Sequence, residues 1–390
     1  MLASFEKLEA YISEEKYQGY DPYDTLNSWV PFHWLGKWGP VLATQVQKRN
    51  PINIRPLLGI KKEINPKAFG LFLHAYSILY KEFGKKEDLE KADYFYTWLK
   101  ENASKGYQGT CWGYNFSWAS PQKQIPPFFP SSVVTGTVAK GLYEYYLVTK
   151  KDEVIELLKG ASVFMDTELE KYEDETGLSI SYTPAKADIC YNASLLAAET
   201  LAKTYSITKE ERYRDMAIKC GNFVIAHQQK DGRWNYNWDP KTGKEQKQVD
   251  FHQGYILESL FEIKKALNYS DPKWESSIKS GIDFYCDQQF HESGRSYWRL
   301  PKLYPAEIHN QSQGIITLAM MSEYRTDSVE LMEKITNWTI ANMQDKKGYF
   351  YYRIFKSHTN KIPFMRWSQA WMFLALSYYQ VALKRNTPSQ

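Results

Sequence analysis

Side chains that can transfer protons or hold a sugar recur at the start of several similar stretches of the chain. Each stretch begins with polar residues, passes through a polar-then-small pair and continues as an apolar helix pattern. The last four stretches begin with these candidates: Asp188, Tyr191 and Asn192; Asp250, His252 and Gln253; His309, Asn310 and Gln313; Arg366, Trp367 and Gln369. Histidines, an arginine, carboxylates and amides at equivalent repeat positions are typical of a small-molecule or glycan cleft.

The same residues could instead serve only the fold. Asp188 and Asp250 could cap helix N-termini, and the amides could bond between helices. A metal site is not predicted, because the four cysteines are scattered, with no Cys-x-x-Cys pair and no zinc-ligand spacing.

The elements that must position these residues follow from the repeat itself. The polar-then-small pairs start at residues 69, 135, 192, 253, 313 and 369, so that successive copies are 56 to 66 residues apart. Amphipathic helix patterns lie between them at 86–102, 152–169, 209–229, 271–289 and 327–344. With an N-terminal helix added, six outer helices alternate with six inner ones. The sequence predicts an all-α fold, an (α/α)6 toroid that is one domain over 1–390, with 1–60 less regular and supplying the first outer helix.

In a closed helical ring, the turns from outer to inner helices open on one rim. Four of these turns are long and aromatic, at 109–118, 231–240, 293–307 and 346–355. A glycine followed by alternating aromatic residues predicts short β-hairpins there. We expect Trp112, Trp234, Tyr236 and Trp298 to stack on sugar rings, unless the hairpins only pack on each other.

The stretch "QGYDPYDTLNSW" (18–29) is a further candidate. On the same rim, Asp21, Tyr23 and Asp24 would lie near the funnel and contact substrate. Alternatively, Asp24 caps a helix that begins at Thr25. The two roles are compatible for different aspartates.

Composition narrows the class of protein. Tyr, Phe and Trp make up 16% of the 390 residues, a supply that suits aromatic-lined clefts. The net charge of +4 is well mixed, without the basic run of a nucleic-acid surface. The sequence shows no signal-peptide pattern and no transmembrane stretch. We therefore expect a cytoplasmic protein with reduced thiols, which could be peripheral to a membrane; its oligomeric state is open.

The six-hairpin pattern over residues 20–385 resembles the six-hairpin glycosidase-like superfamily. Within it, "SSVVTGTVAKGLYEYYLVTKKDE" and "PFMRWSQAWMFLALSYY" resemble the C-terminal domain of D-glucuronyl C5-epimerases. "YDPYDTLNSW" resembles an N-terminal motif of proteins of polysaccharide and glycan assembly, including hexuronic-acid-processing proteins. The resemblance implies a cofactor-free epimerase or isomerase of polysaccharide or glycan biosynthesis. Its glucuronic-acid-type substrate could be lipid-linked.

Epimerisation requires a base beside a carboxylate and an acid on the opposite face. On this interpretation Arg366 binds the substrate carboxylate bidentately, and Tyr191, His252 and His309, with Asp188, are the catalytic candidates. A hydrolase would need two opposed carboxylates, such as Asp188 with Asp21, Asp24 or Asp250. A lyase would remove the same proton and expel a leaving group. A toroid that only binds glycans is a further alternative.

Overall fold

The computed structural model describes residues 2–119 and 124–386. Within them, six inner helices form a closed ring in which each packs on the next and the last returns to the first. They are α3 (Pro66–Phe83), α5 (Ser132–Thr149), α7 (Tyr191–Thr208), α9 (His252–Leu267), α11 (Ile308–Met320) and α13 (Trp371–Asn386). A π-helical turn, Met365–Ala370, leads into α13. The predicted inner helices are confirmed.

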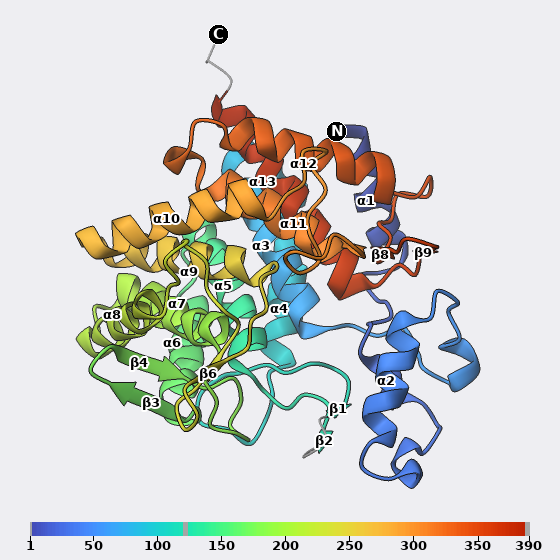
Figure 1. Cartoon of the computed structure of the whole chain (residues 1–390), viewed down its shortest axis with the longest axis horizontal. Coiled ribbons are helices and arrows are strands. Elements are labelled where there is room, and N and C mark those ends of the chain that lie inside the picture. The colour runs from blue at the N-terminus through green and yellow to red at the C-terminus, as the bar shows by residue number, and fades with distance from the viewer. Residues whose placement is uncertain (1, 120–123, 387–390) are drawn as a thin grey trace.

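The outer helices cover this ring (Figure 1). They are α1 (Leu2–Glu14), α4 (Lys86–Glu101), α6 (Asp152–Thr167), α8 (Glu211–Ala226), α10 (Pro272–Gln288) and α12 (Ser328–Met343). Each of α4, α6, α8, α10 and α12 packs on the inner helix that precedes it, and α1 packs on α13. The described residues therefore form the predicted (α/α)6 toroid.

The glycine of three repeat pairs, at positions 70, 136 and 254, lets neighbouring inner helices approach closely. A Cβ on Gly254 of α9 would lie 2.7 Å from the Gln313 side chain and 2.7 Å from Thr317 Oγ1, both on α11. Contacts that short do not occur between real side chains, so a side chain at this position would push α9 away from α11.

Short antiparallel strands lie within the loops that lead from outer to inner helices. The pairs are β1 (Trp118–Ala119) with β2 (Gln124–Ile125), β3 (Lys171–Asp174) with β4 (Gly177–Ile180), and β5 (Trp238–Asp239) with β6 (Lys244–Glu245); β7 (Ala306–Glu307), β8 (Arg353–Ile354) and β9 (Thr359–Asn360) form a three-stranded sheet. Rim hairpins were expected from the sequence at four loops, and the ends of those stretches hold β1, β5, β7 and β8. The hairpin of β3 and β4 lies at a loop where none was predicted.

The N-terminal segment contributes a further helix, α2 (Gly39–Arg49), and three 3₁₀ turns at Asp24–Asn27, Phe32–Leu35 and Pro56–Leu58. In Figure 1, α2 lies to one side of the helical ring. No helix among the described residues is long and apolar enough to cross a bilayer.

Candidate active site

A cavity of about 960 Å³ opens at the N-terminal ends of the inner helices. Its lining comes from the rim loops and from the first turns of α3, α7, α9 and α11, with the π-helical turn before α13. Sequence candidates that line it are Tyr23, Asp188, Asn192, Tyr236, Asp250, His252, Trp298, His309, Arg366 and Trp367. The ring thus brings together side chains from four repeats and the N-terminal segment.

His252 is held by a buried carboxylate. Its Nδ1 lies 2.5 Å from Asp250 Oδ1, and the backbone N–H of His252 donates to the same oxygen at 3.2 Å. Burial opposes ionisation of Asp250, but His252 and then Arg299 outweigh it and hold the pKa of that carboxyl below its usual value. An ionised carboxylate only accepts, so His252 Nδ1 donates the proton and Nε2 is left to accept one.

A second histidine is held differently. His309 Nε2 lies 2.5 Å from the hydroxyl of Tyr255. Burial, with Lys67 next in importance, places the pKa of His309 well below its usual value, and burial raises that of Tyr255. His309 is therefore neutral at neutral pH, and its Nδ1 has no hydrogen-bond partner among the described residues.

Phe251 separates the two histidines. Its ring stacks on His252 with centroids 4.2 Å apart and on His309 with centroids 4.3 Å apart. Two rings at these distances cannot share one face of a phenyl ring, so the imidazoles lie on opposite faces of Phe251. The arrangement presents two separate proton-transfer groups to one cavity.

None of the three lysines that line the cavity was predicted, and burial lowers the pKa of two of them. Lys48 of α2 bonds to the hydroxyl of Tyr23, and burial, with Arg353 adding to it, lowers the pKa of Lys48 to about 7. Lys67 of α3 is buried, and burial, then Arg366, holds its pKa well below the usual value. Among the described residues, the Lys67 ammonium has no ion-pair partner, and it lies 5.4 Å from the ring of Trp371.

Positive side chains outnumber negative ones around the cavity. Lys48, Lys67, Lys186, Arg299, Arg353 and Arg366 line it, against Asp188, Asp250 and Glu307. Glu307 is already engaged, since it accepts from Arg353 at 3.0 Å and from the Trp367 indole at 2.8 Å. Lys186 is exposed and has no ion-pair partner among the described residues, and Lys48, with a pKa near 7, is partly protonated at neutral pH. These two side chains favour an anionic ligand.

The contacts of Arg366 with Asp21 contradict the role predicted for Arg366. Nε and Nη2 of Arg366 donate to the two carboxylate oxygens of Asp21 at 2.6 and 2.8 Å, and both side chains are buried. The bidentate carboxylate is thus one from the protein itself, 345 residues away in the chain, and not one from a substrate. Asp21 does not line the cavity and is not placed to contact a ligand.

Asp24 is also structural. It forms an ion pair with the buried Arg55 at 2.7 Å and accepts the backbone N–H of Asp21 at 2.9 Å. The 3₁₀ turn that begins at Asp24 has no side-chain cap, so the predicted capping role at Thr25 is wrong. The stretch 18–29 is thus held to Arg55 within the N-terminal segment and to Arg366 of the ring, and it contributes only Tyr23 to the cavity.

Three aromatic candidates lie in the core instead of on the rim. Trp112 and Trp234 are fully buried, and their indole N–H groups donate to backbone carbonyls of α4 and α8. Tyr191 is fully buried and donates to Glu245 at 3.0 Å. None of the three lines the cavity, so stacking by the tryptophans and proton transfer by Tyr191 are not supported. Removal of a large aromatic ring from water lowers the free energy of the fold, which is why these three rings pack into the core.

Two of the three repeated glutamines clamp the rim loops. Gln253 accepts the backbone N–H of Trp234 at 2.9 Å and donates to its carbonyl at 2.7 Å. Gln369 makes the same two bonds with Phe350, at 2.8 and 2.9 Å. These predicted substrate-binding residues do not line the cavity. An amide can satisfy one donor and one acceptor of the same residue, which explains why the position recurs.

Two further amides point into the protein. Gln313 donates to Glu258 and Thr317 within the ring. Asn310 accepts from the Phe251 backbone at 2.8 Å and donates to the Trp298 carbonyl at 3.3 Å. Asn310 therefore positions the ring that separates the two histidines.

Asp188 lines the cavity without capping a helix. It accepts the backbone N–H of Tyr182 at 2.9 Å, and Cys190 is the residue that precedes α7. Burial raises the pKa of Asp188. A carboxyl group of this kind can donate a proton near neutral pH more readily than an exposed one.

The cavity residues that were missed could have been found in part. Lys67 lies in the first turn of the first inner helix, at the level where the other copies carry their polar candidates. The repeat signal is weak in this copy, because its pair is Phe69-Gly70 and lacks the polar residue. Tyr255, in the first turn of α9, and Glu307, directly before α11, stand beside predicted candidates and could have been found in the same way. Arg353 lies on β8 of a rim hairpin and carries no comparable signal.

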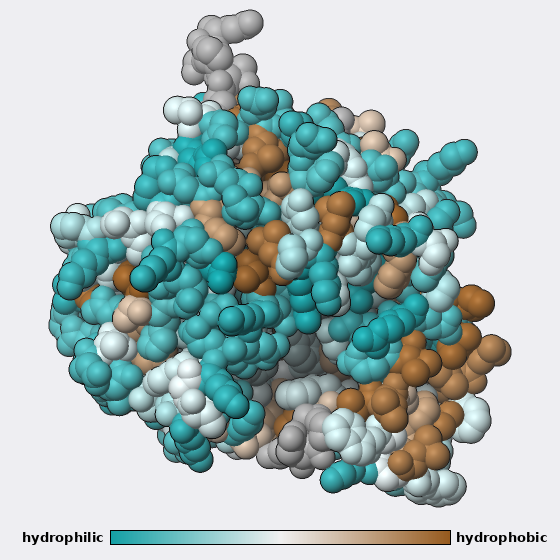
Figure 2. Space-filling view, viewed as in Figure 1, coloured by the Kyte–Doolittle hydropathy of each residue, from teal (hydrophilic) through white to brown (hydrophobic). Residues whose placement is uncertain are grey.

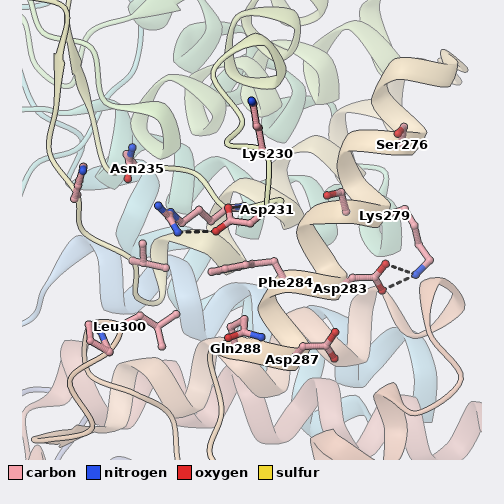
Figure 3. A pocket seen from close by; sticks show the side chains of 15 residues that line it. Lys230, Asp231, Asn235, Ser276, Lys279, Asp283, Phe284, Asp287, Gln288 and Leu300 are labelled. Atoms are coloured by element: carbon pink, nitrogen blue, oxygen red, sulfur yellow. Dashed lines mark hydrogen bonds and ion pairs between the residues drawn. The ribbon is translucent and has the colours of Figure 1, made fainter.

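A second cavity, of about 880 Å³, lies outside the ring between the loop after α8 and helix α10 (Figure 3). Four of its charged side chains pair with each other, Arg233 with Asp231 at 2.6 Å and Lys279 with Asp283 at 2.5 Å. None of the sequence candidates lines it. Across residues 2–119 and 124–386, no three His, Cys, Asp or Glu side chains are grouped to hold a metal.

Comparisons with known proteins agree with this fold. The profile of the family described as beta-L-arabinofuranosidase, GH127 catalytic domain, matches residues 25–289. No curated protein sequence matches the chain.

Similar solved structures include two epimerases and a hydrolase. Cellobiose 2-epimerase from Bacillus thermoamylovorans is 15% identical over 80% of this chain and 87% of its own, with a TM-score of 0.64. A sugar epimerase from a ruminal bacterium is 13% identical over 85% and 91%, with a TM-score of 0.68. An unsaturated glucuronyl hydrolase specific for heparin is 12% identical over 84% and 90%, with a TM-score of 0.60. Identities this low establish the shared fold alone.

Proposed function

The chain belongs to the family of the beta-L-arabinofuranosidase GH127 catalytic domain and is a carbohydrate-active enzyme of the (α/α)6 superfamily, and we propose that it is a sugar epimerase or isomerase. The observation that carries the proposal is the pair of differently held histidines on the two faces of Phe251, both lining the same cavity.

The chemistry follows from the states of the two histidines. His252, oriented by Asp250, removes the proton from a carbon beside a carbonyl or carboxylate, and the electron pair moves onto that oxygen. The His309–Tyr255 pair returns a proton to the same carbon or its neighbour. Lys67 supplies donors for the oxygen that becomes negative. Epimerisation and isomerisation differ only in which carbon receives the proton.

The excess of basic residues around the cavity supports an acidic sugar, as the resemblance to the glucuronyl C5-epimerase domain implied. That finer relationship stays a prediction. Lys48 and Lys186 are the cations best placed for a substrate carboxylate, because Arg366 is taken by Asp21, Arg353 by Glu307 and Arg299 by Asp250 at 3.6 Å.

The test is proton NMR of sugars incubated with the purified protein in D2O, with neutral disaccharides and uronic-acid glycans as parallel substrates. Deuterium at the carbon next to the carbonyl or carboxylate, with the glycan intact, supports the proposal. His252→Asn should abolish the exchange, while His358→Asn, an exposed histidine on the β8–β9 hairpin, should leave it unchanged. A vinylic proton would identify a lyase, and either that or an unreacted panel would contradict the proposal.

Glycoside hydrolysis is the second candidate, favoured by the family match and by two carboxyls whose pKa values are shifted in opposite directions. Burial raises that of Asp188, while Asp250 is held low. Such a division suits an acid and a base. Both oxygens of Asp250, however, are engaged, by His252 and by Gln248 at 2.7 Å. A new reducing-end signal in the same NMR experiment would select this reaction.

A further inference from the structure

The N-terminal segment carries an extended apolar surface. Among the described residues, eight of the twelve exposed large hydrophobic side chains fall within positions 29–57 and are 50–80% exposed. We call them the apolar patch: Trp29, Trp34, Leu35, Trp38, Leu42, Val46, Ile52 and Leu57. Figure 2 shows brown atoms gathered at the lower right of the molecule, where Figure 1 places α2. Patches of this kind mark interaction surfaces.

Helix α2 is oriented with its apolar side outward. Its buried residues include Pro40, Thr44 and Gln47, spaced to form one face against the neighbouring 3₁₀ turns and β1. Leu42 and Val46, on another face, are 59% and 69% exposed. A helix of a water-facing surface would place its polar residues outward instead. The outward apolar face therefore needs a partner.

The charge of the segment indicates what that partner is. From residue 25 to residue 62 there is no aspartate or glutamate, whereas six lysines and arginines occur. Of these, Lys37, Arg49 and Lys61 are exposed and have no ion-pair partner among the described residues. A surface of tryptophan and aliphatic side chains with flanking cations is typical of an interfacial contact with anionic lipid headgroups.

A second copy of the chain fits this surface less well. A two-fold interface places the same patch on both sides, so it would gather the cations of residues 25–62 from both copies, and that stretch contains no acidic residue to neutralise them. We propose that the apolar patch docks the protein on the surface of an anionic lipid bilayer.

The docked protein would hold its cavity close to the bilayer. Helix α2 directs Lys48 into the cavity lining while Leu42 and Val46 face outward, and Tyr23 of the same segment bonds to Lys48. If the proposed function holds, the geometry suits a sugar presented at the membrane surface, such as one carried on a lipid.

Vesicle co-sedimentation of the full chain tests the docking without requiring any activity. Vesicles of phosphatidylcholine with one-third phosphatidylglycerol are compared with vesicles of phosphatidylcholine alone. We expect binding to the anionic vesicles, weakened at least tenfold by raising the salt from 0.05 to 0.5 M, together with a blue shift of tryptophan fluorescence.

The triple variant Trp34→Ser, Trp38→Ser, Leu42→Ser should lose at least tenfold in vesicle binding, because it removes three of the apolar side chains that would enter the bilayer. These side chains are largely exposed to water in the free protein, so the fold should not depend on them. Leu2→Ser, which removes an equally exposed apolar side chain on α1, is the matched control and should bind as the parent does. Circular dichroism confirms that both variants keep the helical fold.

Absence of binding by the parent protein would overturn the proposal, as would equal binding by the triple variant. A concentration-dependent dimer in light scattering that the triple variant abolishes, without vesicle binding, would assign the patch to a second copy instead. Vesicle binding without turnover of any sugar would leave the docking standing and refute only the proposed function.

Discussion

The bidentate pair between Asp21 and Arg366 offers a quantitative test of how the N-terminal segment is attached. The Arg366 side chain is 2% exposed and that of Asp21 is 6% exposed, so Asp21→Asn leaves a buried guanidinium without its counter-charge. Removal of one partner of a buried pair typically costs about 3–5 kcal/mol. The same substitution also weakens the bond that Asp21 accepts from the Tyr23 backbone at 3.0 Å. We therefore expect a loss near the upper end of that range.

The assay is urea unfolding followed by tryptophan fluorescence, for the parent, Asp21→Asn, Arg366→Met and the double variant Asp21→Asn, Arg366→Met. Each single variant should lose about 3–5 kcal/mol of unfolding free energy, and the double variant should lose clearly less than their sum, because it removes both charges together. Single losses below about 1 kcal/mol, or additive losses, would refute the reasoning. If Arg366 instead held a substrate carboxylate, Arg366→Met would raise KM with little change in stability.

Three further predictions concern the cavity and its supports. Asp250→Asn should lower kcat about 100-fold or more with little change in KM, because His252 loses the acceptor that sets its tautomer; unchanged steady-state rates would contradict this. Because burial brings the pKa of Lys48 to about 7, that ammonium loses its charge as pH rises from 6 to 8. Glucuronate binding, measured by calorimetry, should weaken over this range, and in Lys48→Met this pH dependence should be reduced. Gln253→Ala should cost about 1–3 kcal/mol in urea unfolding, since it leaves both backbone groups of the buried Trp234 unpaired; a loss of a few tenths would be too small for a clamp.

The sequence was sufficient for the fold because the signals it uses are local. Hydrophobic periodicity within each helix and a pair repeated every 56 to 66 residues predicted the inner and outer helices, and the structure confirms both sets. The rim could be located as well, since alternating helices of a closed ring place all of their connecting loops of one kind at the same end.

Residue roles within the site were predicted less well, and the misses have a common cause. Gln253 and His252 are adjacent in sequence and both start the same inner helix, yet one turns to a loop backbone and the other to the cavity. Successive helical residues point about 100° apart, so a shared repeat position does not set a shared environment. Trp234 is buried and Tyr236 lines the cavity, although residues two apart in a regular strand would share a face. The loop is irregular here and bends at Tyr236, and the sequence pattern does not show that bend.

By itself, the sequence determined the toroid, its rim and the supply of proton-transfer groups at the starts of the inner helices. Only the tertiary structure decided which charges are free to meet a ligand. Asp21 and Arg366 are separated by 345 residues, and their mutual neutralisation depends on ring closure. The outward apolar face of α2 is decided in the same way, because periodicity shows that a helix has two faces but not which one the rest of the protein covers.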